Sequence, residues 1–244
     1  MKTFISLTFL VLCGTLLPAQ LVGTKGAFRT DHGIVTIERF DPVKKNLHLG
    51  VMVLHGGTGP NGDWRKSGIL EALVGAGYPV FVPHYFDSTG DAKPEDWPQK
   101  FGTYIRTLND ASRYVAHQPD IQSTQIGLVG IALGGFLSIG LAEETFSHPP
   151  PMRSPKIKAV VEMYGGMPEF AIARMIAMPP VLILHGEDDN LVPVSEARNL
   201  EKVLKEKSQP YQIKIYSHQG HSFEGDALQD ARQQMVTFLH DHLR

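Results

Sequence analysis

The seven residues Val129-Gly130-Ile131-Ala132-Leu133-Gly134-Gly135 decide the fold of this chain. They overlap the apolar run 126–131, which predicts a buried strand, and they open an apolar stretch that predicts a helix from Gly135. A Gly-x-x-x-Gly frame at this place relieves crowding around a strained strand-to-helix turn. Such a turn is typical of sites at which a sheet presents a reactive side chain, but the central residue here is Ala132.

Apolar runs and amphipathic stretches alternate along the rest of the chain. The apolar runs predict strands at 49–54, 79–83, 126–131, 159–163, 181–184 and 211–216. The amphipathic stretches predict helices at about 66–74, 101–117, 135–144, 194–206 and 226–242. Residues 33–38 alternate in polarity, which predicts an antiparallel edge strand. Together these elements indicate an α/β fold, a doubly wound and mostly parallel sheet with helices on both faces.

The composition limits the class of protein. A chain of 244 residues fits one domain, because single cores grow up to about 250 residues before chains divide. With 42% hydrophobic and 20% charged residues, the chain is expected to fold rather than remain disordered. The net charge is −2, whereas proteins that bind nucleic acids are usually basic. We therefore expect no nucleic-acid partner, and we expect a small neutral or anionic ligand.

The first 19 residues have the pattern of a secretory signal peptide. Lys2 is followed by an apolar run over 4–17 and then by Pro18-Ala19, which predicts cleavage near Ala19. The run is too short to cross a bilayer comfortably, so no membrane span is predicted. We therefore expect a secreted or periplasmic protein with one domain over 20–244. Cys13, the only cysteine, would be removed with the signal; as an alternative lipoprotein site it is disfavoured by the bulk of Leu12.

Polar and glycine-rich segments follow three further strands. Since the carboxyl ends of parallel strands meet at one edge of a sheet, these segments are expected to converge there. The turn His55-Gly56-Gly57 lets backbone N–H groups approach a ligand, as an oxyanion site requires, although a plain glycine turn has the same composition. Asp188 and Asp189 follow the strand 181–184, where an acid could orient an imidazole or cap the next helix.

Two histidines occupy the last loop before the C-terminal helix. His221 follows Gly220 and is placed to reach the same edge of the sheet, in the chain order turn, acid, histidine. His218 and His221 could instead bind a metal together with Asp188. No further ligand pattern supports that alternative, so we predict no metal.

Four of these segments resemble the dienelactone hydrolase family of the α/β-hydrolase superfamily, over essentially the whole mature length. They are His55-Gly56-Gly57, the turn 130–135, His185-Gly186-x-x-Asp189-x-x-Val192-Pro193 and Gly220-His221-Ser222-Phe223. The last two also occur in prolyl-oligopeptidase-like peptidases. The resemblance implies Asp189 as the acid and His221 as the base of a catalytic triad. It also implies an oxyanion hole formed by backbone N–H groups at Leu133 and near Gly57, and no cofactor.

The sequence departs from the family at Ala132, where members carry Ser or Cys as the nucleophile. A methyl group has no lone pair, so covalent hydrolysis of an ester or lactone is expected to be impaired or absent. Three interpretations stay open: a natural ligand-binding pseudo-hydrolase, an esterase or prolyl-oligopeptidase-like enzyme whose nucleophile was substituted, and slow hydrolysis by water that His221 and Asp189 activate. The expected partner is a small ester, lactone or carboxylate, and the oligomeric state is not predicted.

Other segments allow two interpretations each. Residues 167–178 are predicted to form a small helical cap, although a plain crossover would have the same pattern. The methionines of this segment could pack in the core or form a flexible wall around an apolar ligand. Arg65 could contact an acidic substrate group or lie solvated at a helix start, and the aromatic residues of 84–87 could line a pocket or pack in the core. Ser138 lies nearly two helical turns beyond Ala132, so it is not expected to replace the nucleophile.

Overall fold

The computed structural model describes residues 21–243 except 44–46, 91–95, 122–124, 148–154, 169–170 and 173–174. The predicted signal peptide and Cys13 lie outside these residues, so export stays a prediction. Within the described residues, no helix combines the length and apolarity that a membrane crossing requires.

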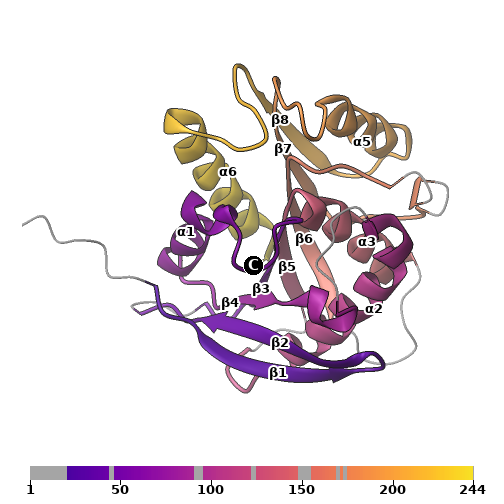
Figure 1. Cartoon of the computed structure of the whole chain (residues 1–244). Coiled ribbons are helices and arrows are strands. Elements are labelled where there is room, and N and C mark those ends of the chain that lie inside the picture. Colours follow the sequence, from indigo (N-terminus) through magenta and orange to yellow (C-terminus); the bar gives the residue numbers. More distant parts are fainter. Residues whose placement is uncertain are drawn as a thin grey trace, which may run out of the picture.

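An eight-stranded sheet forms the centre of the molecule (Figure 1). Its order is β1-β2-β4-β3-β5-β6-β7-β8, and β3 to β8 run parallel while β1 and β2 are antiparallel. The strands are β1 (Thr24–Thr30), β2 (Gly33–Phe40), β3 (Val51–Leu54), β4 (Val80–Pro83), β5 (Gln125–Ile131), β6 (Lys156–Met163), β7 (Val181–Gly186) and β8 (Tyr211–Tyr216). The predicted doubly wound, mostly parallel sheet is confirmed.

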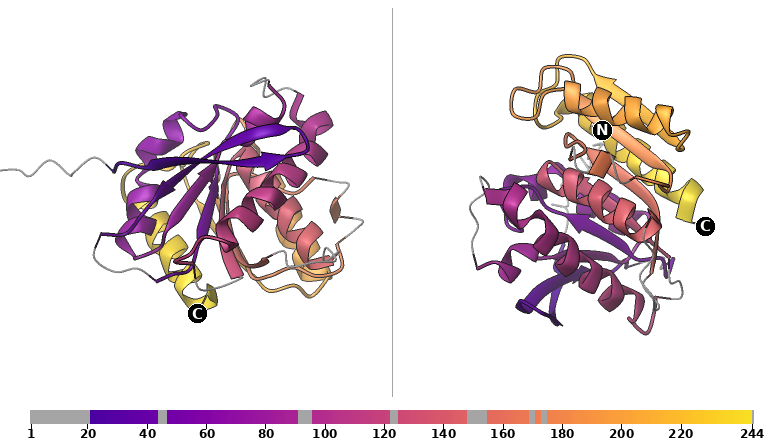
Figure 2. Two further views of the ribbon diagram at one scale, coloured as in Figure 1. Left: turned by 90° about the horizontal axis from the view of Figure 1, so that it is seen from below. Right: turned by 90° about the vertical axis from the view of Figure 1, so that its right-hand side faces the viewer.

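Helices cover both faces of the sheet, as the two views of Figure 2 also show. They are η1 (Asp63–Ser67), α1 (Ile69–Gly75), η2 (Tyr85–Ser88), α2 (Trp97–Ala116), α3 (Leu133–Ser147), α5 (Ser195–Glu206) and α6 (Gly225–Leu243). Buried residues of α1 and α6 pack with one set of strand side chains, which we call the α1/α6 core. Buried residues of α2, α3 and α5 pack with the other set, which we call the α2/α3 core. The central strands are therefore apolar on both faces, as their sequences indicate.

The position of the strand over 33–38 is corrected by the structure. It is not the edge of the sheet, because β1 pairs with it on the outer side, from Thr30 opposite Gly33 to Thr24 opposite Arg39. The sequence of β1 gives little sign of a strand, since Phe28 is its only buried residue. A mostly exposed strand is stabilised by backbone pairing with its neighbour, and hydrophobic periodicity does not detect that pairing.

The predicted cap over 167–178 lies partly outside the described residues. Met167, Met175 and Met178 are buried and belong to the α2/α3 core. Of the two functions considered for these methionines, the structure thus supports packing.

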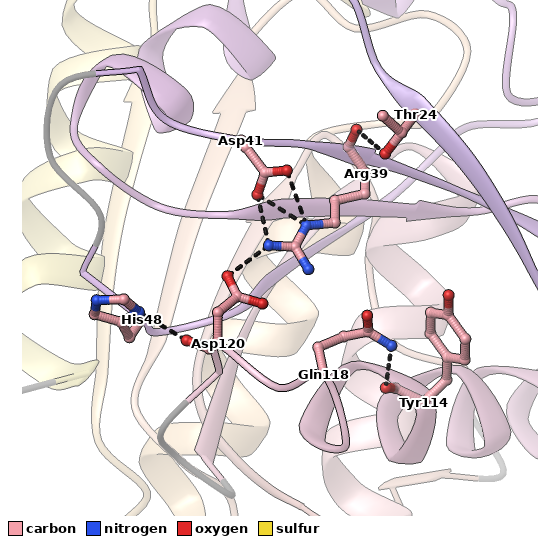
Figure 3. Close-up of polar contacts among 7 residues, drawn as sticks. All are labelled: Thr24, Arg39, Asp41, His48, Tyr114, Gln118 and Asp120. Carbon is pink, nitrogen blue, oxygen red and sulfur yellow. Dashed lines mark hydrogen bonds and ion pairs between the residues drawn. The ribbon is translucent and has the colours of Figure 1, made fainter.

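One arginine connects the antiparallel part of the sheet to the segment before β5 (Figure 3). Arg39 Nε lies 2.8 and 3.0 Å from the two carboxylate oxygens of Asp41, and its Nη2 lies 2.5 Å from Asp120 Oδ2. The Asp120 carbonyl in turn contacts His48 Nδ1 at 2.7 Å. Both carboxylates hold the pKa of Arg39 above its usual value. The planar guanidinium is required here, because it donates hydrogen bonds to two carboxylates at once.

Replacing Arg39 with Lys is expected to lower the free energy of unfolding by about 1–2 kcal/mol, since the charge remains but the forked hydrogen bonds are lost. Urea denaturation monitored by circular dichroism measures the change. The exposed Arg29, on β1, provides the matched control, and its replacement with Lys is expected to leave the midpoint unchanged. Equal urea midpoints for the two variants would contradict the stabilising role given to the hydrogen bonds of the Arg39 guanidinium.

Candidate active site

The turn between β5 and α3 holds its central residue in a left-handed conformation. Ala132 has φ of 53°, which an L-residue other than glycine rarely adopts. Its N–H donates to the Met163 carbonyl at 3.0 Å, and its own carbonyl accepts from the Gly135 N–H at 2.8 Å. A strained residue of this kind costs about 1–3 kcal/mol and persists only where its surroundings fix it. The strained turn that the glycine spacing predicts is therefore present around an alanine.

Glycines allow this turn to pack against the backbone of β3. A Cβ on Gly134 would lie 2.0 Å from the Leu54 carbonyl oxygen, and a Cβ on Gly130 would lie 2.2 Å from the carbonyl oxygen of Gly134. Both obstacles are backbone atoms, so no side-chain rotation can relieve the contact. The Gly-x-x-x-Gly frame is thus a packing requirement of the turn.

Replacing Gly134 with Ala is expected to destabilise the protein by 3 kcal/mol or more, roughly the upper range for overpacked sites, because the strand and the turn must separate. Gly102 is the matched control, since it lies exposed in α2 and its nearest neighbour would be a flexible Arg106 atom at 3.6 Å. There the same substitution is expected to stabilise by up to about 1 kcal/mol through helix propensity. Thermal denaturation of both variants distinguishes the two cases, and similar shifts would contradict the packing explanation.

The structure brings Asp189 and His221 together. His221 Nδ1 lies 2.8 Å from Asp189 Oδ2, while Asp189 Oδ1 accepts N–H groups from Leu191 at 2.9 Å and Val192 at 2.8 Å. The Asp189 carboxylate can only accept hydrogen bonds, so the Nδ1–H group of His221 donates to it. Nε2 is then the ring nitrogen of His221 that is left as an acceptor, and His221 lines the same cavity as Ala132.

The neighbouring acid and histidine lie elsewhere. His218 and Asp188 are mostly exposed, with Nδ1 and Oδ2 3.8 Å apart. His218 and Asp188 are therefore not part of the pair formed by His221 and Asp189. Among the residues that the structure describes, no three potential metal-binding side chains of His, Cys, Asp or Glu gather at one point.

Two backbone segments face the space beside Ala132. Leu133 is the first residue of α3, so its N–H has no acceptor within the helix, and Gly57 lines the cavity from the turn after β3. That turn is fixed by His55, whose ring stacks on Tyr85 at 4.0 Å and whose carbonyl accepts the Tyr85 hydroxyl at 2.6 Å. Burial lowers the pKa of His55 to about 3, so the ring is neutral. The two residues whose N–H groups are expected to form an oxyanion hole therefore line one cavity.

The cavity at this edge of the sheet has a volume of about 930 Å³. Aromatic and aliphatic side chains form most of its wall, and Ala132, Leu133 and His221 lie in its lining. This size suits a small organic ligand. The side chain of Ser138 points elsewhere, because it is buried and donates to the Gly135 carbonyl at 2.8 Å.

Two residues next to the site had no role assigned from the sequence. His185 is buried, with Nε2 2.8 Å from the Val192 carbonyl and 3.4 Å from Asp189 Oδ2, so it supports the loop that carries the acid. Glu162 lies fully buried near the end of β6 and accepts the Gly165 N–H through Oε1. Burial raises the pKa of Glu162 to about 8. A charged residue within the apolar run 159–163 was the signal that could have identified Glu162.

Side-chain contacts decide between the two interpretations given for Arg65 and for residues 84–87. Arg65 neither meets the cavity nor lies solvated, because its guanidinium bonds Glu38 Oε1 at 2.6 Å and the Pro60 carbonyl at 2.5 Å. His84 contacts the same Glu38 oxygen at 2.6 Å. Tyr85 and Phe86 pack in the α2/α3 core rather than in the cavity wall. Glu38, an acid on β2, had not been predicted to pair with either side chain.

Comparison with known proteins agrees with this architecture. A solved dienelactone hydrolase from Anabaena variabilis superposes with a TM-score of 0.74 at 20% identity, covering 93% of this chain and all of the other. The acylaminoacyl peptidase of Pyrococcus horikoshii superposes with a TM-score of 0.71 at 15% identity, over 91% of this chain and 41% of the peptidase. These two likenesses show the fold.

Sequence relatives define the family. The carboxymethylenebutenolidase homolog of Xenopus tropicalis is 23% identical over 196 residues, which cover 72% of this chain and 75% of that protein. The model of the dienelactone hydrolase family matches residues 40–238. The predicted resemblance is confirmed: this chain belongs to the dienelactone hydrolase family, with the α/β-hydrolase fold.

Proposed function

We propose that this protein binds a small ester or lactone in a hydrolase pocket in which Ala132 has replaced the attacking side chain. The observation that carries the proposal is the pair of His221 and Asp189, 2.8 Å apart, bordering the same cavity as a left-handed Ala132. A purely structural protein would have no need of a strained turn and a carboxylate-supported imidazole that line the same cavity. Binding is the activity that these groups retain, because orientation and oxyanion contacts do not require the nucleophile.

The proposed roles follow from the geometry. Asp189 orients the His221 ring, and its charge would stabilise the imidazolium that forms when Nε2 accepts a proton. The N–H groups of Leu133 and of the turn at Gly57 would donate to the carbonyl oxygen of the ligand. Ala132 occupies the position at which members of the family carry Ser or Cys, and it lacks the attacking atom that these residues have beyond Cβ, so no acyl-enzyme would form there.

One observation favours slow hydrolysis as a second function. With Nδ1 engaged by Asp189, the free Nε2 of His221 could take a proton from a water molecule that attacks the bound carbonyl. Any hydrolysis by the unmodified chain should then disappear in the His221→Ala variant and persist in the control His218→Ala, since His218 is exposed and lies away from the cavity lining.

The proposal is tested with p-nitrophenyl esters of short and aromatic acids. We expect the unmodified chain to bind these esters with little or no turnover, and the Ala132→Ser variant to hydrolyse them. A folded Ala132→Ser variant that neither binds nor hydrolyses any ester or lactone would overturn the proposed function. Circular dichroism of the variant establishes that the fold is intact.

A further inference from the structure

The cavity beside Ala132 draws its walls from both sides of the sheet. Trp64 and Ile69 belong to the α1/α6 core, and Leu228 packs against it. Trp97 and Phe136 pack against the α2/α3 core. The cavity therefore crosses the carboxyl edge of the sheet rather than lying within one face.

Ala132 lies between these two walls. Its side chain packs against the α1/α6 core, whereas the next residue, Leu133, belongs to the α2/α3 core. A carbonyl carbon held opposite the Ala132 methyl group would thus have one substituent on each side of the sheet edge. Both substituents would meet aromatic rings, Trp64 on one side and the Trp97–Phe136 pair, whose centroids are 5.4 Å apart, on the other.

Charged groups in the described lining give little help to an anionic ligand. Lys66 is the only Lys or Arg in the described lining. Its ammonium group donates to Asp63 Oδ1 at 2.7 Å, and its side chain is 83% exposed. Asp63 and Glu224 add carboxylates to the lining. Within the described lining, a ligand carboxylate would therefore lose water in a mostly apolar cavity without gaining an unpaired Lys or Arg, which is unfavourable.

We propose that the ligand of this cavity is a neutral carbonyl compound with apolar, ring-bearing groups on both sides of the carbonyl. This inference rests on the proposed function and names the class of ligand within it. Apolar groups on both sides would bury against Trp64 and against Trp97 with Phe136, while the carbonyl oxygen stays at the N–H groups of Leu133 and Gly57.

The two tryptophans provide a direct measurement, because the chain contains only these two and both line the cavity. The probe is N-benzylphenylacetamide, a neutral amide with a ring on each side that is inert on the time of a titration. We expect it to change the tryptophan emission of the unmodified chain. In the Trp64→Phe and Trp97→Phe variants the remaining tryptophan should still respond. A response confined to one of the two tryptophans would overturn the two-sided arrangement.

Charge selectivity is measured with two isosteric derivatives of this probe. One carries a carboxamide and the other a carboxylate at the para position of the benzyl ring. We expect the carboxamide to bind about tenfold more tightly or better. Neutralising the lining with Asp63→Asn and Glu224→Gln should narrow that ratio. Equal or tighter binding of the carboxylate, or no binding of any of the three amides, would overturn the inference.

These titrations are independent of turnover. One outcome would be that the neutral amide binds the unmodified chain while the Ala132→Ser variant hydrolyses no ester. This outcome would contradict the hydrolase pocket of the proposed function and support the proposed class of ligand. Ester hydrolysis by the Ala132→Ser variant together with preference for the carboxylate would do the reverse. The two proposals can therefore fail separately.

Discussion

Replacing Ala132 with Ser is expected to raise ester hydrolysis by about 10³-fold or more over the unmodified chain. Loss of the nucleophile in a serine hydrolase lowers kcat by about 10⁶-fold, so its return recovers the largest single contribution to the covalent route. Serine adds only a hydroxyl to the Cβ that alanine already has. The left-handed φ of 53° and the hydrogen bonds of the turn are already in place, so the new hydroxyl should need no backbone rearrangement.

The expected gain depends on the histidine and on its acid. In the Ala132→Ser background, a further His221→Ala or Asp189→Asn substitution should abolish most of the gain in activity, because the hydroxyl then lacks an oriented base. Ser138→Ala in the same background is the matched control and should leave kcat/KM unchanged, since Ser138 is buried and absent from the cavity lining. Full activity of the double variant Ala132→Ser/His221→Ala would contradict the assigned base. Initial rates with p-nitrophenyl esters measure each case.

Replacing Glu162 with Gln is expected to stabilise the protein at alkaline pH and to have little effect at pH 4. In the folded protein the pKa of Glu162 is about 8, whereas its ordinary value is 4.5. Between these values the folded state keeps the proton and the unfolded state releases it, so the free energy of unfolding falls as pH rises through this window. At 1.36 kcal/mol for each pH unit, the loss reaches about 5 kcal/mol near pH 8.

Glutamine removes this titration and preserves the acceptor for the Gly165 N–H. Urea denaturation at several values between pH 4 and 9 should therefore give equal midpoints for both proteins at the acidic end and a higher midpoint for the variant at the alkaline end. Glu71→Gln, at an exposed position of α1, controls for the loss of one surface carboxylate and should follow the unmodified chain. Parallel pH profiles for the Glu162 variant and the unmodified chain would contradict the buried, protonated state.

The arrangement around Glu162 also explains why this acid is tolerated. A Cβ on Gly135 would lie 2.8 Å from Glu162 Oε1, and a Cβ on Gly165 would lie 2.7 Å from the same oxygen. The carboxyl group thus occupies space that these two glycines leave open between β6 and the turn that carries Ala132. Glu162 is a packing element of the turn, and burial of its neutral form costs less than burial of a carboxylate would.

The local sequence determined the strands and helices and the identity of the turn. Periodicity over a few residues sets which face of an element is apolar, and the glycine spacing of 130–135 indicates a close-packed turn between a strand and a helix. The absence of an attacking atom at Ala132 was likewise visible without coordinates. The weakly apolar β1 escaped detection, because its stability comes from pairing with β2 rather than from its own pattern.

Tertiary structure decided which side chains act together. Asp188 and Asp189 are adjacent in sequence, and the selection of Asp189 by position in the family motif gave no distance. Only the packing of β7 beside β8 places Asp189 at His221, 32 residues away. The partner of Arg65, the burial of Glu162 and the two aromatic walls of the cavity were decided in the same way. Contacts of this kind join segments far apart in the chain, so their distances depend on the packed sheet and not on local patterns.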